Sequence, residues 1–524
     1  MGRPQTLSHA APTAELRRPE QQAGVERFQH ATRLDGAPVA VYLVPILGAA
    51  AVLRVWQLGS TGFNSDEAVY AGQAAAIAEH PELEEYFPVF RAHPLLVQAL
   101  LSVGFRLGLD DGFERLTVAV MGVATVYLVY ELGRLLYGRR AGLFAALLMA
   151  LMPYHVVVSR QVLLDGPMTF FAVLTMLLLT RFVLSGRPVW LYATGAAMGL
   201  TILSKETSIV LLGAVYAFLA LTPELRVRLR DLAVSVCVMA LVVAPFPLSV
   251  MLAGRPGTGE SYLTWQLFRR PNHDLLFYPA TVPEAVGPLV LLAAVAGLWL
   301  LRRKSSWRET LLVAWIAVPV VFFWLWPVKG FQYLLPIAPP LALLAGRSLS
   351  RLPSPASRGL QALGATIVAL SLLVPAWERV EGARPENFVA GSGGLPGGRE
   401  AGGWIDERVP KGATFMTIGP SMANLVQYYG RRKAYGLSVS PNPLNRNPSY
   451  EPLINPDRAL REGEVQYLVW DTFSATRAPG FSDALLGYTD RYDGRIVHTE
   501  VLPARTALGE NADRPAIVVF EVRP

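Results

Sequence analysis

A carboxylate pair near the N-terminal end of the chain is a candidate for proton transfer. Asp66 and Glu67 follow Asn64 in the segment NSDEAVYAGQAAAIAEH. Asn64 with Glu67 three residues later is the pattern of a helix N-terminal capping box, and capping alone explains Glu67. It does not explain Asp66, and Tyr70 follows one turn later on the same helix face. The spacing therefore predicts a helix that holds Asp66 as a candidate general base, with Tyr70 as a substrate contact.

Two further groups of ionisable residues interrupt apolar sequence. Arg160 and Asp165 stand in SRQVLLDGP, and Lys205 and Glu206 stand in GLTILSKETSIVLL. An ionisable group near membrane depth costs about 2.5–3.5 kcal/mol, so such residues usually face a cavity or a partner. Arg160 and Asp165 could instead snorkel or pair at a helix end. A Lys205–Glu206 pair is a weak explanation, because adjacent residues on a helix point in different directions.

The composition defines the elements that must position these residues. The chain has 524 residues, of which 52% are hydrophobic and only 17% charged, against roughly a quarter in an ordinary soluble domain. Repeated apolar runs of helix-spanning length exclude a purely soluble enzyme and a disordered protein and indicate a polytopic membrane protein. The single cysteine, Cys237, excludes a disulfide framework and a cysteine-based zinc site. The net charge of +7 sits mostly between apolar runs, which is a topology signal and not a nucleic-acid footprint.

Basic connections set the predicted topology, because Lys and Arg are retained on the cytoplasmic side. About eleven transmembrane helices alternate without conflict when the basic connections are cytoplasmic. The N-terminus is then inside and the C-terminal region outside. The apolar segment 93–109, which Arg106 interrupts, is expected to lie in the outer interface without spanning. The predicted spans are 38–57, 114–135, 141–158, 167–185, 189–203, 207–221, 232–252, 285–301, 310–326, 333–349 and 360–377.

Composition also predicts the domain organisation. Residues 1–37 are expected to form a disordered cytoplasmic tail, 38–377 a transmembrane module with a first extracytoplasmic loop at 58–113, and 378–403 a linker. Residues 404–524 are expected to form a small extracytoplasmic α/β domain, since the segments 413–418, 465–470 and 516–522 have strand character. Asp66, Arg160, Asp165 and Lys205 then all lie on the extracytoplasmic side.

Five segments occur in an order that resembles a known superfamily. They are FNSDEAVYA, RAHPLLVQALL, YGRRAGLFAALLMALMPYHVVVSRQVLLDGPMTFF, GLTILSKETSIVLL and FQYLLPIAPPLALLAG. In this order they look like the landmarks of the GT-C membrane glycosyltransferases, in the branch with the protein O-mannosyltransferases and the lipid A aminoarabinose transferases. The resemblance covers about Val41 to Gly346. It implies a GT-C-like fold and a lipid-phosphate-linked sugar donor.

The resemblance also implies roles for individual residues. The acidic residue of the first loop, the family's catalytic base, maps onto Asp66, with Glu67 as its companion. The second acidic position maps onto Asp165 and the Arg before it onto Arg160. The Lys of a family landmark maps onto Lys205, where a cation faces the donor phosphate.

Two landmarks depart from the family pattern. The first-loop landmark reads His93-Pro94-Leu95, which makes His93 a candidate substrate contact. A later landmark reads Gln332-Tyr333 where the family has an Arg that contacts lipid-linked phosphate. Lys329, three residues earlier, is the candidate replacement, and Gln332 and Tyr333 are candidate acceptor contacts.

These features together predict an inverting glycosyltransferase of the plasma membrane and cell envelope. It would move a sugar from a polyprenyl-phosphate donor in the bilayer to a hydroxyl acceptor on a protein, lipid or glycan. A transporter or flippase of lipid-linked sugars is the alternative, although no internal repeat is visible. A non-catalytic scaffold would leave the landmarks unexplained. The sequence requires no cofactor; the candidate ligands for a divalent metal are Asp66, Asp165, His93 and His273.

Overall fold

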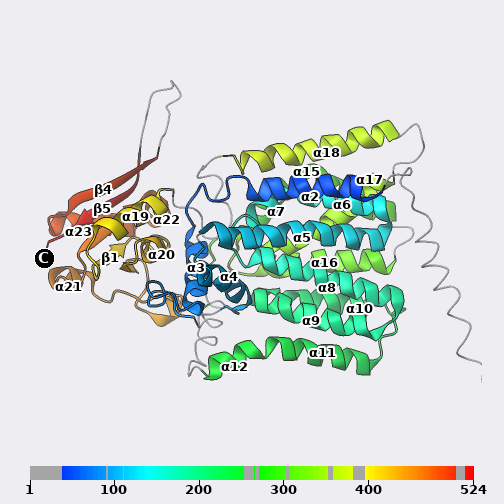
Figure 1. The fold of residues 1–524 in the computed structure, drawn as a ribbon, viewed down its shortest axis with the longest axis horizontal. Helices are drawn as coiled ribbons and strands as arrows, with labels where there is room; N and C mark the ends of the chain where they lie inside the picture. Colours follow the sequence, from blue (N-terminus) through cyan, green and yellow to red (C-terminus); the bar gives the residue numbers. More distant parts are fainter. Residues whose placement is uncertain are drawn as a thin grey trace, which may run out of the picture.

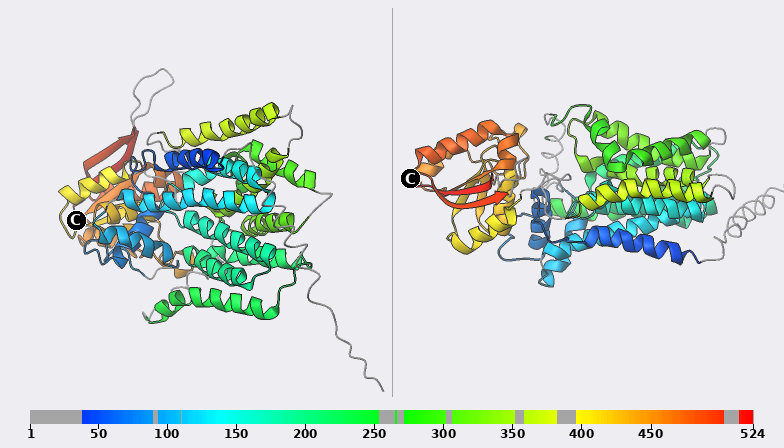
Figure 2. Two further views of the ribbon diagram at one scale, coloured as in Figure 1. Left: turned by 45° about the vertical axis from the view of Figure 1, so that its right-hand side comes forward. Right: turned by 90° about the horizontal axis from the view of Figure 1, so that it is seen from above.

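The chain folds into a helical bundle capped at one end by a smaller α/β unit (Figure 1). A computed structural model describes residues 38–89, 93–109, 111–252, 265, 271–301, 306–351, 358–381, 396–502 and 514–523. Between the bundle and the α/β unit lie two short helices, α3 (Ser65–Ile77) and α4 (Leu96–Arg106). The view from above in Figure 2 shows the same three layers. The predicted tail, 1–37, lies outside the described residues.

The bundle is built from apolar helices that overlap the predicted spans, several of which are divided into shorter elements. Among the described residues, four helical segments are long and apolar enough to cross a membrane, with α11 and α12 counted together as one of them. The number is five if the pair α14–α15, bent by 92°, also counts as one span. Several shorter apolar helices pack beside them. The elements are α2 (Ala40–Val55), α5 (Asp111–Tyr137), α6 (Arg139–Leu151), α7 (Pro153–Val158), α8 (Asp165–Ser185), α9 (Pro188–Ser204), η1 (Glu206–Ile209), α10 (Val210–Ala220), α11 (Leu229–Val243), α12 (Pro245–Leu252), α14 (Phe277–Val286), α15 (Pro288–Leu301), α16 (Trp307–Leu325), η2 (Phe331–Ile337), α17 (Ala338–Ser350) and α18 (Arg358–Glu378).

Proline explains where several predicted spans are divided. The predicted span 141–158 is divided into α6 and α7 at Pro153, and 232–252 into α11 and α12 at Pro245. Proline fits the first turn of a new helix but removes a hydrogen bond from the interior of a continuous one. The bundle interior is apolar and includes the fully buried Trp315, whereas Leu241 and Leu252 on the outer helices are 73% and 88% exposed. This distribution is that of an integral membrane protein, whose outer surface meets lipid.

The layer between bundle and α/β unit begins with the predicted capping box. The Asn64 side chain accepts a hydrogen bond from the Glu67 backbone N–H, and the Glu67 carboxylate accepts one from the Asn64 N–H, both at 2.9 Å. The predicted helix after Asn64 is therefore confirmed as α3. Helix α4 has 11 residues, a length of about 16 Å, which is too short to cross a bilayer. Figure 1 shows α4 beside α3 at the end of the bundle.

The α/β unit contains a five-stranded mixed sheet in the order β2-β1-β3-β5-β4. The pairs β1–β2 and β1–β3 are parallel, and β3–β5 and β4–β5 are antiparallel. Three strands coincide with the segments predicted from sequence, and two, β2 and β4, were not predicted. The elements are α19 (Gly398–Arg408), β1 (Thr414–Thr417), α20 (Pro420–Tyr429), β2 (Lys433–Gly436), η5 (Pro443–Asn445), α21 (Pro456–Arg461), β3 (Tyr467–Asp471), α22 (Thr472–Arg477), α23 (Pro479–Arg491), β4 (Arg495–Leu502) and β5 (Arg514–Glu521).

The α/β unit and the first loop share one hydrophobic core. Phe415 and Ile517, on one face of the sheet, belong to the same buried cluster as Ala71 of α3 and Phe87 of the loop. The opposite face has its own cluster, which includes Leu485 of α23. Helices α18 and α19 extend into the predicted linker, 378–403, of which residues 382–395 lie outside the described part.

Polar contacts reinforce this docking. The Phe63 backbone N–H donates to the Tyr429 hydroxyl at 2.8 Å, and the Arg399 guanidinium donates to the Gly59 and Thr61 carbonyls at 3.0 and 2.8 Å. Arg431 lies 2.8 Å from the Glu82 carboxylate. The first loop is therefore fixed between the bundle and the α/β unit.

Candidate functional site

A cavity of about 660 Å³ lies where the three layers meet. The bundle, the first loop and the α/β unit all contribute to its wall, and most of the wall is polar or aromatic. Among the residues singled out from the sequence, those that line it are Asp66, Tyr70, His93, Lys205, Glu206, His273, Lys329, Gln332 and Tyr333. The cavity thus gathers most of the predicted site at one end of the bundle.

Helix α3 presents the candidate base to this cavity. Asp66 is in the first turn of α3, immediately after the cap, and Tyr70 lies one turn further on. Both line the cavity. The first turn of a helix is a position that the helix dipole makes favourable for an acidic side chain.

Glu67 faces away from the cavity into a closed network. Its side chain is fully buried, and its two oxygens accept hydrogen bonds at 2.8 Å from the Arg115 guanidinium. One of these oxygens also accepts from the Val162 backbone N–H at 2.9 Å, and the other accepts the capping bond from Asn64. Glu67 therefore fixes the start of α3 and the segment at Val162, and this geometry supports a positioning role.

Lys205 and Asp165 form a buried pair behind the cavity wall. The Lys205 ammonium lies 2.8 Å from each carboxylate oxygen of Asp165, and it lies 4.6 Å from the centre of the Tyr333 ring. Lys205 reaches the cavity, whereas Asp165, only 2% exposed, does not line it. Asp165 therefore orients the cation and compensates its charge.

Arg160 does not line the cavity either. Its guanidinium donates to the Leu53 carbonyl at 3.0 Å, which ties the segment between α7 and α8 to the end of α2. Arg160 does not pair with Asp165, whose carboxylate is bound to Lys205.

A second polar pair joins the first loop to the bundle. His93 Nδ1 lies 2.8 Å from a Glu206 carboxylate oxygen, and the His93 ring meets Tyr70 edge-on with centroids 5.8 Å apart. Both His93 and Glu206 line the cavity. The structure thus directs Lys205 and Glu206, adjacent in sequence, to different partners.

The short helix η2 and the residues before it form another part of the cavity wall. The Lys329 backbone is held on both sides by Asn272, whose amide donates to the Lys329 carbonyl and accepts from its N–H, each at 2.8 Å. The Lys329 ammonium donates to the Trp326 carbonyl at 3.1 Å. Gln332 and Tyr333 follow in η2, where Tyr333 also packs against Phe323. Lys329 is thus held rigidly as a second cation of the wall.

The α/β unit supplies cavity residues that the sequence reasoning missed. Arg446 and Arg477 line the cavity, and the Arg477 guanidinium lies 4.7 Å from the Phe473 ring centre. Burial, the nearby Arg477 and, more weakly, Lys329 lower the pKa of His273, although Asp274 opposes them. Arg477 and Lys329 therefore both act on the His273 side of the cavity. No local sequence pattern marks these arginines, which lie far from the other site residues in the chain.

The described part of the chain builds no metal centre. Among the described residues, no group of three or more His, Cys, Asp or Glu side chains is placed to hold an ion. Of the four candidate ligands, Asp165 is bound to Lys205 and His93 to Glu206.

Comparison with known sequences places part of the chain near mannosyltransferases. A family described as dolichyl-phosphate-mannose-protein mannosyltransferase matches residues 92–250. Two curated relatives from Bacillus subtilis (strain 168) are the putative mannosyltransferase YycA, 39% identical over 82 residues (16% of this chain), and the putative mannosyltransferase YkcB, 28% identical over 149 residues (27% of this chain). The matched parts span only 12% and 21% of the length of these relatives.

Comparison with solved structures shows a likeness over nearly the whole chain. The crystal structure of ArnT from Cupriavidus metallidurans in the apo state matches with a TM-score of 0.68 and 16% identity, over 92% of this chain and 97% of that chain. The same protein bound to undecaprenyl phosphate matches with a TM-score of 0.67 and 17% identity, over 95% and 98%. The predicted resemblance is confirmed in sequence by the mannosyltransferase family that matches residues 92–250, and the likeness in fold extends beyond Val41–Gly346.

Proposed function

We propose that this protein is an inverting glycosyltransferase that moves a sugar from a polyprenyl-phosphate donor to an acceptor hydroxyl at the extracytoplasmic membrane surface. The observation that carries the proposal is the shared cavity. It has the Asp66 carboxylate at the N-terminus of α3, the Glu206 carboxylate paired with His93, and cations contributed by the bundle and by the α/β unit. The relative bound to undecaprenyl phosphate and the mannosyltransferase-named relatives support the donor class.

The proposed reaction is a single displacement at the anomeric carbon. The Asp66 carboxylate accepts the proton of the acceptor hydroxyl as its oxygen forms a bond to C1 of the sugar. The bond between C1 and the phosphate oxygen breaks on the opposite side, and its electron pair leaves with the polyprenyl phosphate. The configuration at C1 is inverted, and the proton remains on Asp66 until solvent removes it.

The cations of the wall would stabilise the charge that grows on the departing phosphate. The charge of Lys205 is already compensated by Asp165. We therefore assign the larger share of this stabilisation to Lys329 and Arg477, which both lie near His273. Fixed cations in a partly dehydrated cavity act more strongly than the same charges in water. Arg477 would thereby make the α/β unit part of the donor site, in addition to Lys329 of the bundle.

The proposed orientation follows from the basic connections in the sequence. The N-terminus would be cytoplasmic and the cavity and α/β unit extracytoplasmic. The lipid tail of the donor would then lie along the apolar bundle while its sugar reaches the cavity.

A donor-consumption experiment tests this function. The purified protein is incubated in lipid nanodiscs with a panel of radiolabelled polyprenyl-phosphate sugars, and free polyprenyl phosphate and transferred sugar are measured. We expect one donor to be consumed by the wild type and not by Asp66→Asn. Passage of intact donor across a liposome membrane, without cleavage of its phosphate–sugar bond, would instead support a transporter.

A further inference from the structure

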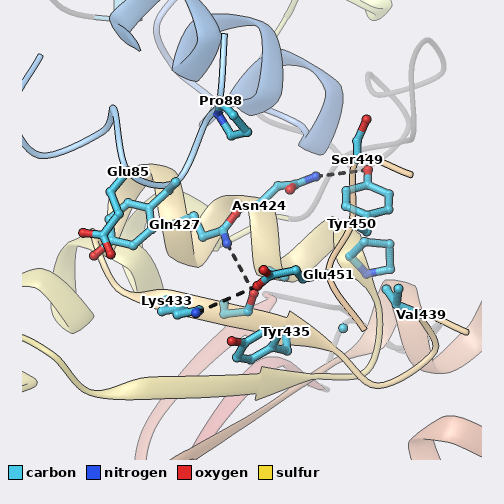
Figure 3. Close-up of a pocket in the computed structure, with 15 residues that line it drawn as sticks. Glu85, Pro88, Asn424, Gln427, Lys433, Tyr435, Val439, Ser449, Tyr450 and Glu451 are labelled. Carbon is cyan, nitrogen blue, oxygen red and sulfur yellow. Dashed lines mark hydrogen bonds and ion pairs between the residues drawn. The ribbon is translucent and has the colours of Figure 1, made fainter. Parts of the chain in front are cut away.

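A second pocket, of about 360 Å³, lies between the first loop and the α/β unit. Figure 3 shows Glu85 of the loop across the pocket from Lys433 and Tyr435 of β2, with Glu451 nearby. The role proposed above for the larger cavity makes no use of this pocket.

The second pocket adjoins the larger cavity. Pro420, Val439 and Tyr450 line both. The amide of Asn424, a buried residue of the second pocket, donates to the Ser65 hydroxyl at 2.9 Å and to the Tyr450 hydroxyl at 3.5 Å. Ser65 directly precedes Asp66, so the wall between the two spaces is connected by hydrogen bonds to the residue beside the proposed base.

The chemistry of the pocket suits a ligand that carries many hydroxyl groups. Its wall combines three tyrosines, two side-chain amides and two carboxylates, and these are Tyr86, Tyr435, Tyr450, Asn424, Gln427, Glu85 and Glu451. Carboxylates accept hydrogen bonds from hydroxyls, and amides both donate and accept. Tyrosines add a flat apolar face with a polar tip. A saccharide offers hydroxyl groups and apolar C–H faces that match this wall.

The second pocket differs from the larger cavity in its charge. Lys433 is its lone cation among the lining residues, and its ammonium lies 3.9 Å from the Glu451 carboxylate and 5.1 Å from the Tyr435 ring centre. Glu85 contributes a second negative charge. A phosphate or another acidic group would be disfavoured here, whereas the larger cavity carries an excess of cations.

A peptide is a poorer fit to the same pocket. A peptide would most readily pair with β2, the edge strand that lines this pocket. However, β2 has only four residues, and the Gln427 amide already donates to the Ala434 carbonyl at 3.3 Å. Lys433 places a charge at the start of the strand. Short length, a charged residue and a blocked carbonyl are features that protect an edge strand from pairing.

We propose that this pocket is a saccharide-binding subsite for a glycan acceptor, whose terminal hydroxyl passes Tyr450 into the larger cavity and reaches Asp66. The proposal that the pocket binds a saccharide is argued from the pocket alone. The acceptor role rests on the proposed glycosyltransferase function, in which that hydroxyl gives its proton to Asp66 and bonds to C1.

A binding experiment on the full-length protein in nanodiscs tests the subsite. The probes are mannotriose, maltotriose and chitotriose, and their contact with the protein is followed by saturation-transfer NMR. The pocket variants are Glu85→Ala and Glu451→Ala, both at exposed positions. Glu84→Ala is the matched control, an exposed neighbour that does not line the pocket. We expect at least one trisaccharide to bind wild type and control, and each pocket variant to bind it about tenfold more weakly.

Three outcomes would overturn the subsite. They are no binding of any trisaccharide at millimolar concentration, equal binding by the pocket variants and the control, and displacement of the bound sugar by an extended Ser/Thr peptide. Binding of undecaprenyl phosphate is measured on the same samples and should be equal in all of them. Saccharide binding without donor consumption would leave the subsite standing and reject the glycosyltransferase function, so the two failures are distinguishable.

Discussion

The ammonium of Lys205 lies 2.8 Å from both carboxylate oxygens of Asp165, and neither side chain is more than 6% exposed. Lys205 reaches the cavity and Asp165 does not. The two residues therefore have different roles: Lys205 presents a cation to the cavity, and Asp165 holds that cation in place.

Removing one member of this pair should destabilise the protein. Lys205→Met leaves the Asp165 carboxylate buried without its cation, which costs about 3–5 kcal/mol. The double variant Lys205→Met/Asp165→Leu should regain most of that stability but only part of the activity, because the cavity still lacks the Lys205 cation while Lys329 and Arg477 remain. Thermal unfolding and sugar transfer are measured on both variants. Full recovery of transfer in the double variant would show that Lys205 serves only the fold.

Glu67 should behave as a positioning residue. Glu67→Gln removes the charge that pairs with the buried Arg115 and should lower stability by about 3–5 kcal/mol. The transfer rate per folded molecule should fall through misplacement of α3, while the pH at which the rate is half-maximal stays where it is in the wild type. A pH–rate profile on the folded fraction checks this. A shift of the acidic side of the pH–rate profile in Glu67→Gln would show that Glu67, and not Asp66, is the base.

Arg477 should contribute to donor binding. Arg477→Gln is expected to weaken the binding of undecaprenyl phosphate by about ten- to a hundredfold, since a hydrogen bond to a charged group contributes about 1.5–3 kcal/mol. Arg458→Gln on α21 is the matched control, because Arg458 makes an exposed contact with Glu462. Isothermal titration in nanodiscs measures both. Equal affinities would remove the α/β unit from the phosphate site.

The segment that carries Arg477 should show pH-dependent stability. Asp471 caps α22 through a 2.7 Å bond from the Ser474 N–H, and its second oxygen is buried with no hydrogen-bond partner among the described residues. Burial raises the pKa of Asp471 from 3.8 to about 6, although the bonds from Ser474 oppose the rise. The native state therefore holds a proton that the unfolded chain has lost between about pH 4 and pH 6, and stability falls as the pH rises through this window.

The variant Asp471→Asn keeps the cap and removes the charge. At pH 7 it should be more stable than the wild type by up to about 3 kcal/mol, and this advantage should shrink toward pH 4. Hydrogen exchange of the β3 and α22 amides, measured by mass spectrometry at both pH values, gives the local difference. An advantage of the same size at both pH values would contradict the raised pKa.

Local patterns in the sequence were sufficient to predict the elements but not their partners. The cap at Asn64, the helix that carries Asp66, and the strands β1, β3 and β5 follow from residue types and periodicity over a few residues. The pairing of Glu67 with Arg115 joins positions 48 apart, and that of Asp165 with Lys205 joins positions 40 apart. Such pairs depend on helix packing, which no local pattern encodes. Arg477 and Arg446 could not be predicted as site residues for the same reason, because the docking of the α/β unit on α3 brings them to the cavity.

The role of Asp66 is the central claim, and single-turnover transfer tests it most directly. Wild type, Asp66→Asn and the control Glu84→Gln, an exposed carboxylate of the same loop, are loaded with the radiolabelled donor that the wild type consumes. Product formation and donor binding are then measured on the same samples. We predict that Asp66→Asn binds the donor as the wild type does but transfers its sugar about 10²–10⁴-fold more slowly, while Glu84→Gln is unchanged. Transfer by Asp66→Asn at the wild-type rate would contradict the account.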